Sequence, residues 1–235
     1  MTTMLTRRLL AGLLLLPLAA PAWALEPTPY VTSSKLDLAI ILPPPVVAGT
    51  PVDAAEQAAV IAAQAQASPE RIQRAAADAE ETVFDMFAST LGDRFAPARL
   101  PLTTLLFARI GASEDATVDP VKKIFGRVRP WLANPTAIKV LIPKSSSGAY
   151  PSGHTTRVTL SAIILASMLP DQRDAIWARA ADYAQSRVIG GMHYPNDLEG
   201  GRRAGTAMAA VMLTQPDFQA DLAAARAELR AAMGM

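Results

Sequence analysis

Hydrophobic positions recur at helical spacing along most of the chain. Ile72, Ala76, Ala79 and Val83, for example, follow one another at intervals of three and four, which is the spacing of one face of an α-helix. Apolar and polar residues alternate over no more than a few positions, so the pattern predicts no persistent strand. We therefore expect an all-α fold in a single domain.

Helix boundaries follow from proline, glycine and capping residues. Ser68 before Pro69 is typical of a helix start, with serine as the N-cap. Pro130 ends the helix before it, and Gly111 with the polar residues after it predicts a connection. The segment 131–152 is irregular, and a loop of that length in a compact domain is usually functional. The pattern predicts helices over residues 53–67, 68–92, 100–110, 119–129, 155–169, 174–187, 198–213 and 217–233.

The segment 25–51 precedes the helical domain (52–235) and is rich in proline. Its apolar residues Leu36, Leu38, Ile40 and Leu42 run into three consecutive prolines, through which no helix continues. We expect an extended N-terminal arm laid over the body of the protein, with these four side chains buried.

The first 24 residues have the pattern of a signal peptide. Arg7 and Arg8 precede an apolar run of about 10 residues, too short for a membrane span, and Ala22-Trp23-Ala24 supplies a small-residue cleavage site. The pattern predicts export, and the periplasm as the destination. An uncleaved anchor is the alternative, and the arginine pair leaves general and twin-arginine export both open.

Charge and cysteine content exclude several classes of function. The net charge of +1 gives no reason to expect nucleic acid or an acidic membrane as a partner. The chain has no cysteine, so disulfides, thiolate catalysis and cysteine-based zinc sites are excluded. The mature chain of about 210 residues is long enough to form a stable hydrophobic core without disulfides or bound zinc.

The two histidines of the chain lie in two separate polar motifs. His193 lies between Arg187 and Asp197, and a helix break at the glycine pair 190–191 would return it beside Arg187. A carboxylate that accepts a hydrogen bond from one nitrogen of the imidazole ring leaves the other nitrogen with a lone pair for nucleophilic attack. The alternative is that Asp197 only caps a helix and that His193 lies near it without a catalytic role.

The second motif, Pro151-Ser152-Gly153-His154, comes just before a strongly apolar helix. Backbone N–H groups at a helix start favour an anion, and Gly153 lets the backbone approach oxygen atoms closely. Ser152 can donate its hydroxyl, and His154 can hold a proton for a leaving oxygen. The alternative is an ordinary Ser/Gly turn.

A third segment supplies cations. Lys122 and Arg129 are seven residues apart, which would put them on one face of a continuous helix. The planar guanidinium group of Arg129 can bind two phosphate oxygens at once, and the ammonium group of Lys122 acts as a point charge. We expect Lys123 and Arg127 to form a solvated basic face.

Together the three motifs resemble the signature of the type 2 phosphatidic acid phosphatase (PAP2) superfamily, and in particular the bacterial class A non-specific acid phosphatases. The resemblance spans Leu36 to about Gly205 and implies a helical bundle of the acid phosphatase and vanadium haloperoxidase type. It implies a secreted enzyme that hydrolyses small phosphomonoesters, with no metal and no cofactor, and it allows a homo-oligomer and phosphotransfer to alcohols. The residues around Met192 and Tyr194 differ from the commonest class A sequence, which leaves substrate preference open.

The resemblance also implies a role for each site residue. His193 would attack phosphorus and become phosphohistidine, Asp197 would orient it, and His154 would act as general acid and then general base. The non-reacting oxygens would be held by Lys122, Arg129, Ser152, Gly153 and Arg187.

Three alternatives compete with this interpretation. In a vanadate-dependent haloperoxidase His193 would instead ligate vanadium. A membrane lipid phosphatase would need several spans of about 20 apolar residues, and the mature chain has none of that length. A non-catalytic helical protein would bind phosphate without turning it over.

Overall fold

The computed structural model describes residues 26–235, and within them every regular element is a helix. The predicted all-α fold is confirmed. The predicted signal peptide, residues 1–24, lies outside the described part. The longer helices are α2 (Pro51–Gln66), α3 (Pro69–Ala77), α4 (Val83–Leu91), α5 (Pro101–Phe125), α7 (Gly153–Met168), α8 (Arg173–Ile189), α9 (Pro195–Met212) and α10 (Pro216–Met233). Two one-turn helices, α1 (Leu38–Ile41) and α6 (Pro130–Ala133), and two short 3-10 turns complete the set.

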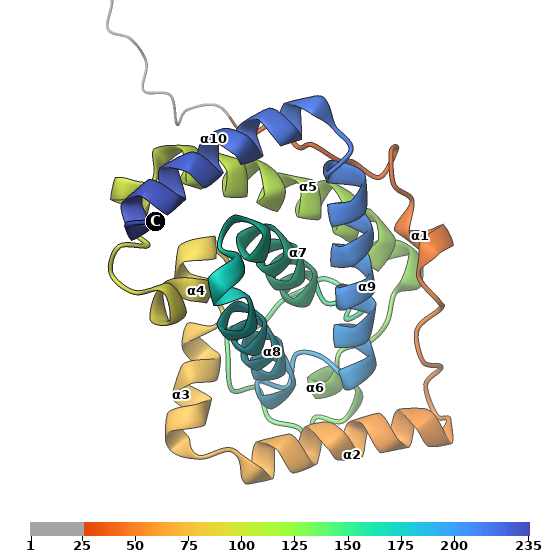
Figure 1. Ribbon diagram of the computed structural model, residues 1–235. Helices are drawn as coiled ribbons and strands as arrows, with labels where there is room; N and C mark the ends of the chain where they lie inside the picture. Colours follow the sequence, from red (N-terminus) through yellow and green to blue (C-terminus); the bar gives the residue numbers. More distant parts are fainter. Residues whose placement is uncertain (1–25) are drawn as a thin grey trace, which may run out of the picture.

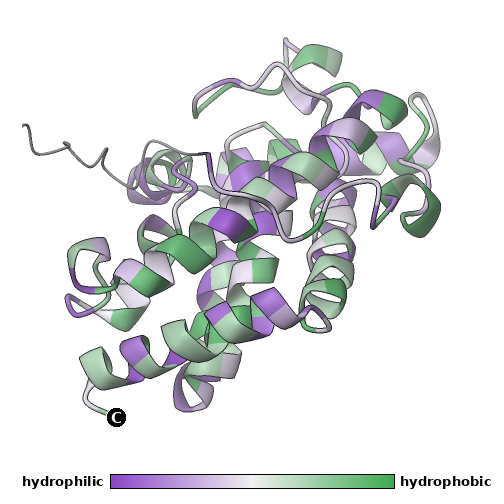
Figure 2. Ribbon diagram, turned by 90° about the horizontal axis from the view of Figure 1, so that it is seen from above, coloured by the Kyte–Doolittle hydropathy of each residue, from purple (hydrophilic) through white to green (hydrophobic). Residues whose placement is uncertain are grey.

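Helix α7 is the centre of the molecule. It packs most extensively against α9 and α8 and also contacts α5, α4 and α10. Figure 1 shows α7 and α8 surrounded by α5 and α10 on one side, α9 on another, and α2 and α3 around the rest. The outer helices mix hydrophilic and hydrophobic residues (Figure 2), as expected of helices that bury one face. Burial on most sides explains why α7 is so apolar.

Glycines allow α9 to lie directly against α7. A Cβ atom at Gly201 would come within 2.7 Å of the Ser152 carbonyl oxygen, and one at Gly205 within 2.7 Å of the Thr156 carbonyl oxygen. These neighbours are backbone atoms of α7 or of its N-cap and cannot swing away. The close contact fixes the N-terminal end of α7, where the second motif lies.

The predicted break between residues 110 and 119 is wrong, because α5 is one continuous helix with Pro120 inside it. Proline removes the N–H that would bond to the carbonyl four residues earlier. Here the backbone N–H of Ser33, in the N-terminal arm, donates to that carbonyl, at Ala116, over 3.3 Å. A contact distant in sequence therefore repairs the helix at the point where local signals predict its end.

The predicted helix over 68–92 is in fact two helices, α3 and α4, separated by residues 78–82. Ser68 caps α3 as predicted, but the Thr82 side chain caps a new helix by accepting from the Asp85 N–H. Asp78 turns inward and pairs with Arg179 at 2.6 Å. The apolar period continues across the break, so periodicity alone does not reveal it.

The N-terminal arm buries three of the four apolar side chains that were expected to be buried. Leu36, Leu38 and Leu42 are buried against the body, but Ile40 is 82% exposed. Ile40 does not point to the same side as the three leucines because residues 38–41 form a single helical turn, capped by Asp37. The arm runs along the side of α5 and past α9 before it reaches α2 (Figure 1).

Candidate active site

The first turn of α7 forms one wall of the site. Ser152 is the N-cap, and its Oγ accepts from the Thr155 N–H at 3.3 Å. A Cβ atom at Gly153 would lie 3.0 Å from Glu114 Oε1 and 3.1 Å from Lys122 Nζ. The missing side chain thus lets the α7 backbone approach both charged groups.

The end of α8 forms the opposite wall. Arg187 lies in its last turn, and Gly191, with φ of +76°, reverses the chain. The N–H groups of Met192 and His193 then donate to the Arg187 carbonyl at 3.0 and 3.2 Å. The turn brings His193 back beside Arg187, as the glycine pair predicts.

Lys122 and Arg129 reach the site from different segments. Helix α5 ends at Gly126, which adopts the left-handed conformation, so Arg129 lies outside the helix as the N-cap of α6. The expectation that the two cations share a helical face is wrong, although both side chains meet in the site. The Arg129 guanidinium is fixed by the carbonyls of Ser147 at 2.8 Å and Met192 at 3.0 Å.

These side chains converge on a cavity of about 170 Å³. Ser152 and Asp197 are fully buried and do not line it. Six of the eight predicted site residues do, namely Lys122, Arg129, Gly153, His154, Arg187 and His193. The lining also contains residues that no motif indicated, namely Glu81, Glu114, Asp115, Asp119 and Ser145.

The three cations of the cavity form no direct ion pair within the described residues, although the carboxylates of Glu114 and Glu81 lie near enough to favour the charges of Lys122 and Arg187. Within residues 26–235 the buried ion pairs are made by other arginines, such as Arg157 and Arg179, and Lys122, Arg129 and Arg187 form none. Arg187 is 2% exposed, and its Nε has no hydrogen-bond partner. Burial lowers the pKa of all three, to about 10 for Arg129. Buried cations that form no direct ion pair can bind an anionic ligand.

His193 is held as a neutral base. Its Nδ1 lies 2.8 Å from the Ala149 carbonyl oxygen, which can only accept, so Nδ1 carries the proton and Nε2 the lone pair. Nε2 lies 3.2 Å from an Arg129 nitrogen. Burial and the charges of Arg129, Lys122 and Arg187 hold the pKa of His193 well below its usual value.

Asp197 lies behind His193. Its Oδ2 is 3.5 Å from His193 Nδ1 and accepts the Tyr194 N–H at 2.8 Å. Its other oxygen accepts from Arg127, which also pairs with Glu56. The expectation that Arg127 belongs to a solvated face is wrong, because its guanidinium is buried between these two carboxylates.

Glu81 is a site residue that the sequence did not reveal. Its Oε1 lies 2.6 Å from His154 Nδ1, while His154 Nε2 lies 3.2 Å from the Ala79 carbonyl oxygen. Burial raises the pKa of Glu81, but the hydrogen bond from His154 and the nearby cations outweigh it and lower that pKa to about 2. Glu81 belongs to no motif, and it lies in the unforeseen break between α3 and α4.

Comparison with known proteins places the chain in a family. The family model described as "PAP2 superfamily" matches residues 101–220, which contain all eight predicted site residues. The chain belongs to the PAP2 superfamily.

Within it, the chain is homologous to bacterial acid phosphatases. It is 30% identical over 203 residues to the non-specific acid phosphatase of Providencia stuartii, covering 83% of this chain and 82% of the relative. It is 31% identical to the non-specific acid phosphatase of Salmonella typhimurium, covering 80% and 78%. An acid phosphatase of Zymomonas mobilis is 28% identical, covering 83% and 76%.

A solved structure shares the fold. It is a transmembrane PAP2-type phosphatidylglycerolphosphate phosphatase from Bacillus subtilis, with a TM-score of 0.50 and 20% identity, covering 69% of this chain and 85% of that one. In the present chain none of the helices among residues 26–235 is long and apolar enough to span a membrane. Over the same residues no group of three or more His, Asp or Glu side chains is arranged to hold a metal ion.

Proposed function

We propose that this chain hydrolyses phosphomonoesters through a covalent phosphohistidine on His193. Family membership and homology to acid phosphatases make it a phosphoric monoester hydrolase. The observation that carries the proposal is the cavity itself, in which three buried cations that form no direct ion pair within residues 26–235 lie around a neutral histidine. Cations fixed in this way stabilise the charge that spreads over the oxygens of a phosphoryl group in the transition state.

The reaction has two steps. In the first, His193 Nε2 forms a bond to phosphorus, the bond to the leaving oxygen breaks, and His154 gives that oxygen its proton. In the second, His154 takes a proton from water, the water oxygen bonds to phosphorus, and the bond to Nε2 breaks. Lys122, Arg129, Arg187 and the Gly153 N–H hold the non-reacting oxygens, and Asp197 orients His193 from 3.5 Å. Ser152, a further phosphate ligand by the resemblance, acts from the N-cap of α7, where its hydroxyl accepts from the Thr155 N–H.

Two variants test whether His193 is the nucleophile and His154 the general acid and base. With p-nitrophenyl phosphate, whose leaving group needs little protonation, His154→Ala should still form the phosphoenzyme but hydrolyse it slowly. Protein denatured with SDS at alkaline pH, where phosphohistidine is stable, should therefore carry label from ³²P substrate in His154→Ala and none in His193→Ala. Label in His193→Ala, or ordinary turnover by that variant, would overturn the assignment of the nucleophile.

Independence from metal is tested separately. Activity of the wild-type protein should survive EDTA, because fixed side-chain cations supply the positive charge. Loss of turnover with EDTA and its recovery with a divalent cation would refute this part of the proposal. Halide oxidation after addition of vanadate and peroxide, in place of ester hydrolysis, would instead favour the haloperoxidase alternative.

Export to the periplasm is the remaining part of the proposal, and it rests on residues 1–24 of the sequence. Protein recovered from a periplasmic extract should begin at Leu25 on N-terminal sequencing. Recovery of the uncut chain in the membrane fraction would support an anchor instead.

A further inference from the structure

A second cavity, of about 460 Å³, adjoins the catalytic one. Glu81 and Asp115 line both cavities, so the two share a wall. The rest of the second cavity is largely apolar and is formed by α4, by α5 and the segment before it, by Glu26 and Pro27 of the arm, and by Arg157 and Ser161 of α7. Its apolar lining includes Val83, Phe84, Pro97, Phe107, Ala108 and Ala112.

The second cavity lies on the side of the site where a leaving group would depart. In phosphoryl transfer the attacking and leaving atoms lie roughly in line, so the leaving oxygen is opposite His193 and next to its proton donor, His154. Glu81 contacts His154 at 2.6 Å and forms part of the shared wall. The organic group beyond the leaving oxygen therefore extends towards the second cavity.

The carboxylates at the shared wall pair with one arginine. Arg157 lies 2.7 Å from both Glu114 and Asp115 and 3.6 Å from Glu81. Its position is further fixed by the Gly111 carbonyl, at 3.3 Å. Because carboxylates outnumber the arginine, the wall suits no second anionic group, and the remaining surface offers mainly aromatic and aliphatic contacts to an apolar group.

We propose that this cavity is the leaving-group subsite, and that it selects phosphomonoesters of aryl and other bulky apolar alcohols over those of small polar alcohols. The inference rests on the proposed function, because it assigns the leaving side of that reaction. The volume of the cavity is within the range of small-molecule sites, and a two-ring aromatic group is a suitable probe.

Binding of non-hydrolysable phosphonates tests the subsite without turnover. By titration calorimetry, 2-naphthylmethylphosphonate should bind about tenfold or more tightly than methylphosphonate, because its rings fill an apolar pocket. Inorganic phosphate should displace both. Equal affinity for the two phosphonates would overturn the proposal.

A matched pair of variants locates the effect. Ala108 is exposed on α5 and lines the cavity, so Ala108→Trp should abolish the preference for the naphthyl compound and leave methylphosphonate binding unchanged. Leu105 is exposed on the same helix outside the cavity, so Leu105→Trp should keep the preference. A naphthyl preference retained in Ala108→Trp would place the rings elsewhere and refute the subsite.

Hydrolysis assays separate this inference from the proposed function. Tight naphthyl binding that Ala108→Trp removes, in a protein that hydrolyses no phosphomonoester, would support the subsite and refute the reaction. Hydrolysis of 2-naphthyl phosphate and glycerol 2-phosphate with equal kcat/KM would support the reaction and refute the selectivity.

Discussion

At the scale of single residues, the proposed reaction depends on the protonation state of His193. An imidazole that attacks phosphorus must be neutral, and an acid phosphatase must keep it neutral at low pH. Burial and the three nearby cations meet this need, because each disfavours a further positive charge. The cations that bind the phosphate would therefore also keep the nucleophile active in acid.

Removing one cation should raise the pKa of His193. In Lys122→Met the repulsion from that ammonium group is lost, so protonation begins at a higher pH and the acid limb of kcat/KM moves upward. NMR titration of the ring measures the shift directly, since the chain has two histidines. Lys123→Met, at an exposed neighbour, serves as the control. An unchanged or lower pKa in Lys122→Met would show that its charge does not act on His193.

Glu81 should act as a positioning residue for His154. Burial lowers the pKa of His154, and the hydrogen bond that His154 donates to Glu81 opposes that shift. In Glu81→Gln that support is weaker, so proton donation to a poor leaving group should suffer. We expect kcat/KM for an alkyl phosphate to fall about tenfold or more, with a much smaller loss for p-nitrophenyl phosphate.

The exposed neighbour provides the control for this prediction. Glu80→Gln should leave both substrates unaffected. An equal loss on both substrates in Glu81→Gln would indicate a structural role for Glu81 instead of one in proton transfer.

The motifs predicted which side chains meet, but not what holds them. Lys122, His154 and His193 could be found because their residue types and spacing suit a phosphate. The Ala149 carbonyl, which fixes the His193 proton, is a backbone group from a distant loop, so no sequence pattern marks it. Arg127 was misjudged because burial between Glu56 and Asp197 depends on the tertiary fold.

At the scale of elements, helical periodicity identified most helices but misplaced their ends. α2, α7, α8, α9 and α10 lie close to the predicted ranges. α5 continues through Pro120 because the arm supplies the missing hydrogen bond to Ala116. Boundaries depend on such long-range contacts, whereas the apolar period is local.

The contact of α9 with α7 yields an element-scale prediction. Gly205→Ala would place a Cβ atom 2.7 Å from the Thr156 carbonyl oxygen, and the two helices must move apart to admit it. We expect the free energy of unfolding, measured with urea, to fall by about 1–3 kcal/mol. Thr206→Ala, at an exposed position on the same helix, should change it by less than about 0.5 kcal/mol. A neutral Gly205→Ala would mean that the helices are less tightly opposed.

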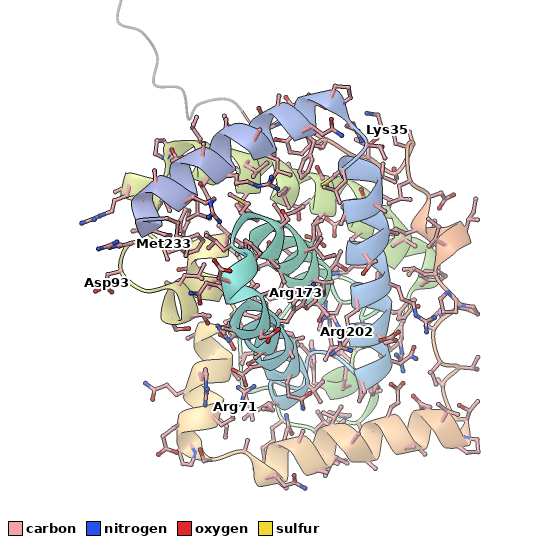
Figure 3. The ribbon with its side chains drawn as sticks, in the orientation of Figure 1. Lys35, Arg71, Asp93, Arg173, Arg202 and Met233 are labelled. Atoms are coloured by element: carbon pink, nitrogen blue, oxygen red, sulfur yellow. The ribbon has the colours of Figure 1, made fainter. Side chains whose placement is uncertain are left out.

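At the scale of the whole molecule, buried charge divides into two kinds. Some arginines tie elements together through ion pairs: Arg127 joins α2 to α9 through Glu56 and Asp197, and Arg179 joins α8 to Asp78 at the end of α3. Arg71 likewise projects from α3 towards α8, where it donates to Ser186 at 2.9 Å (Figure 3). The cations of the catalytic cavity form no such ion pairs within residues 26–235, and burial disfavours their charge, so we expect a bound anion to stabilise the fold.

Arg187 provides the sharpest test of this division. Because its guanidinium is buried and forms no direct ion pair within residues 26–235, Arg187→Met should raise the Tm of the ligand-free protein, by about 2–4 °C for each kcal/mol gained. The wild-type protein should be stabilised by phosphate, by about 2.7 kcal/mol at a hundredfold excess over its Kd. That response should largely disappear in Arg187→Met and persist in Arg202→Met, whose side chain is exposed on α9 (Figure 3). A lower Tm in ligand-free Arg187→Met would make this arginine a structural residue. A higher Tm with a lost phosphate response would mean that the site sacrifices stability for an anion it is built to bind.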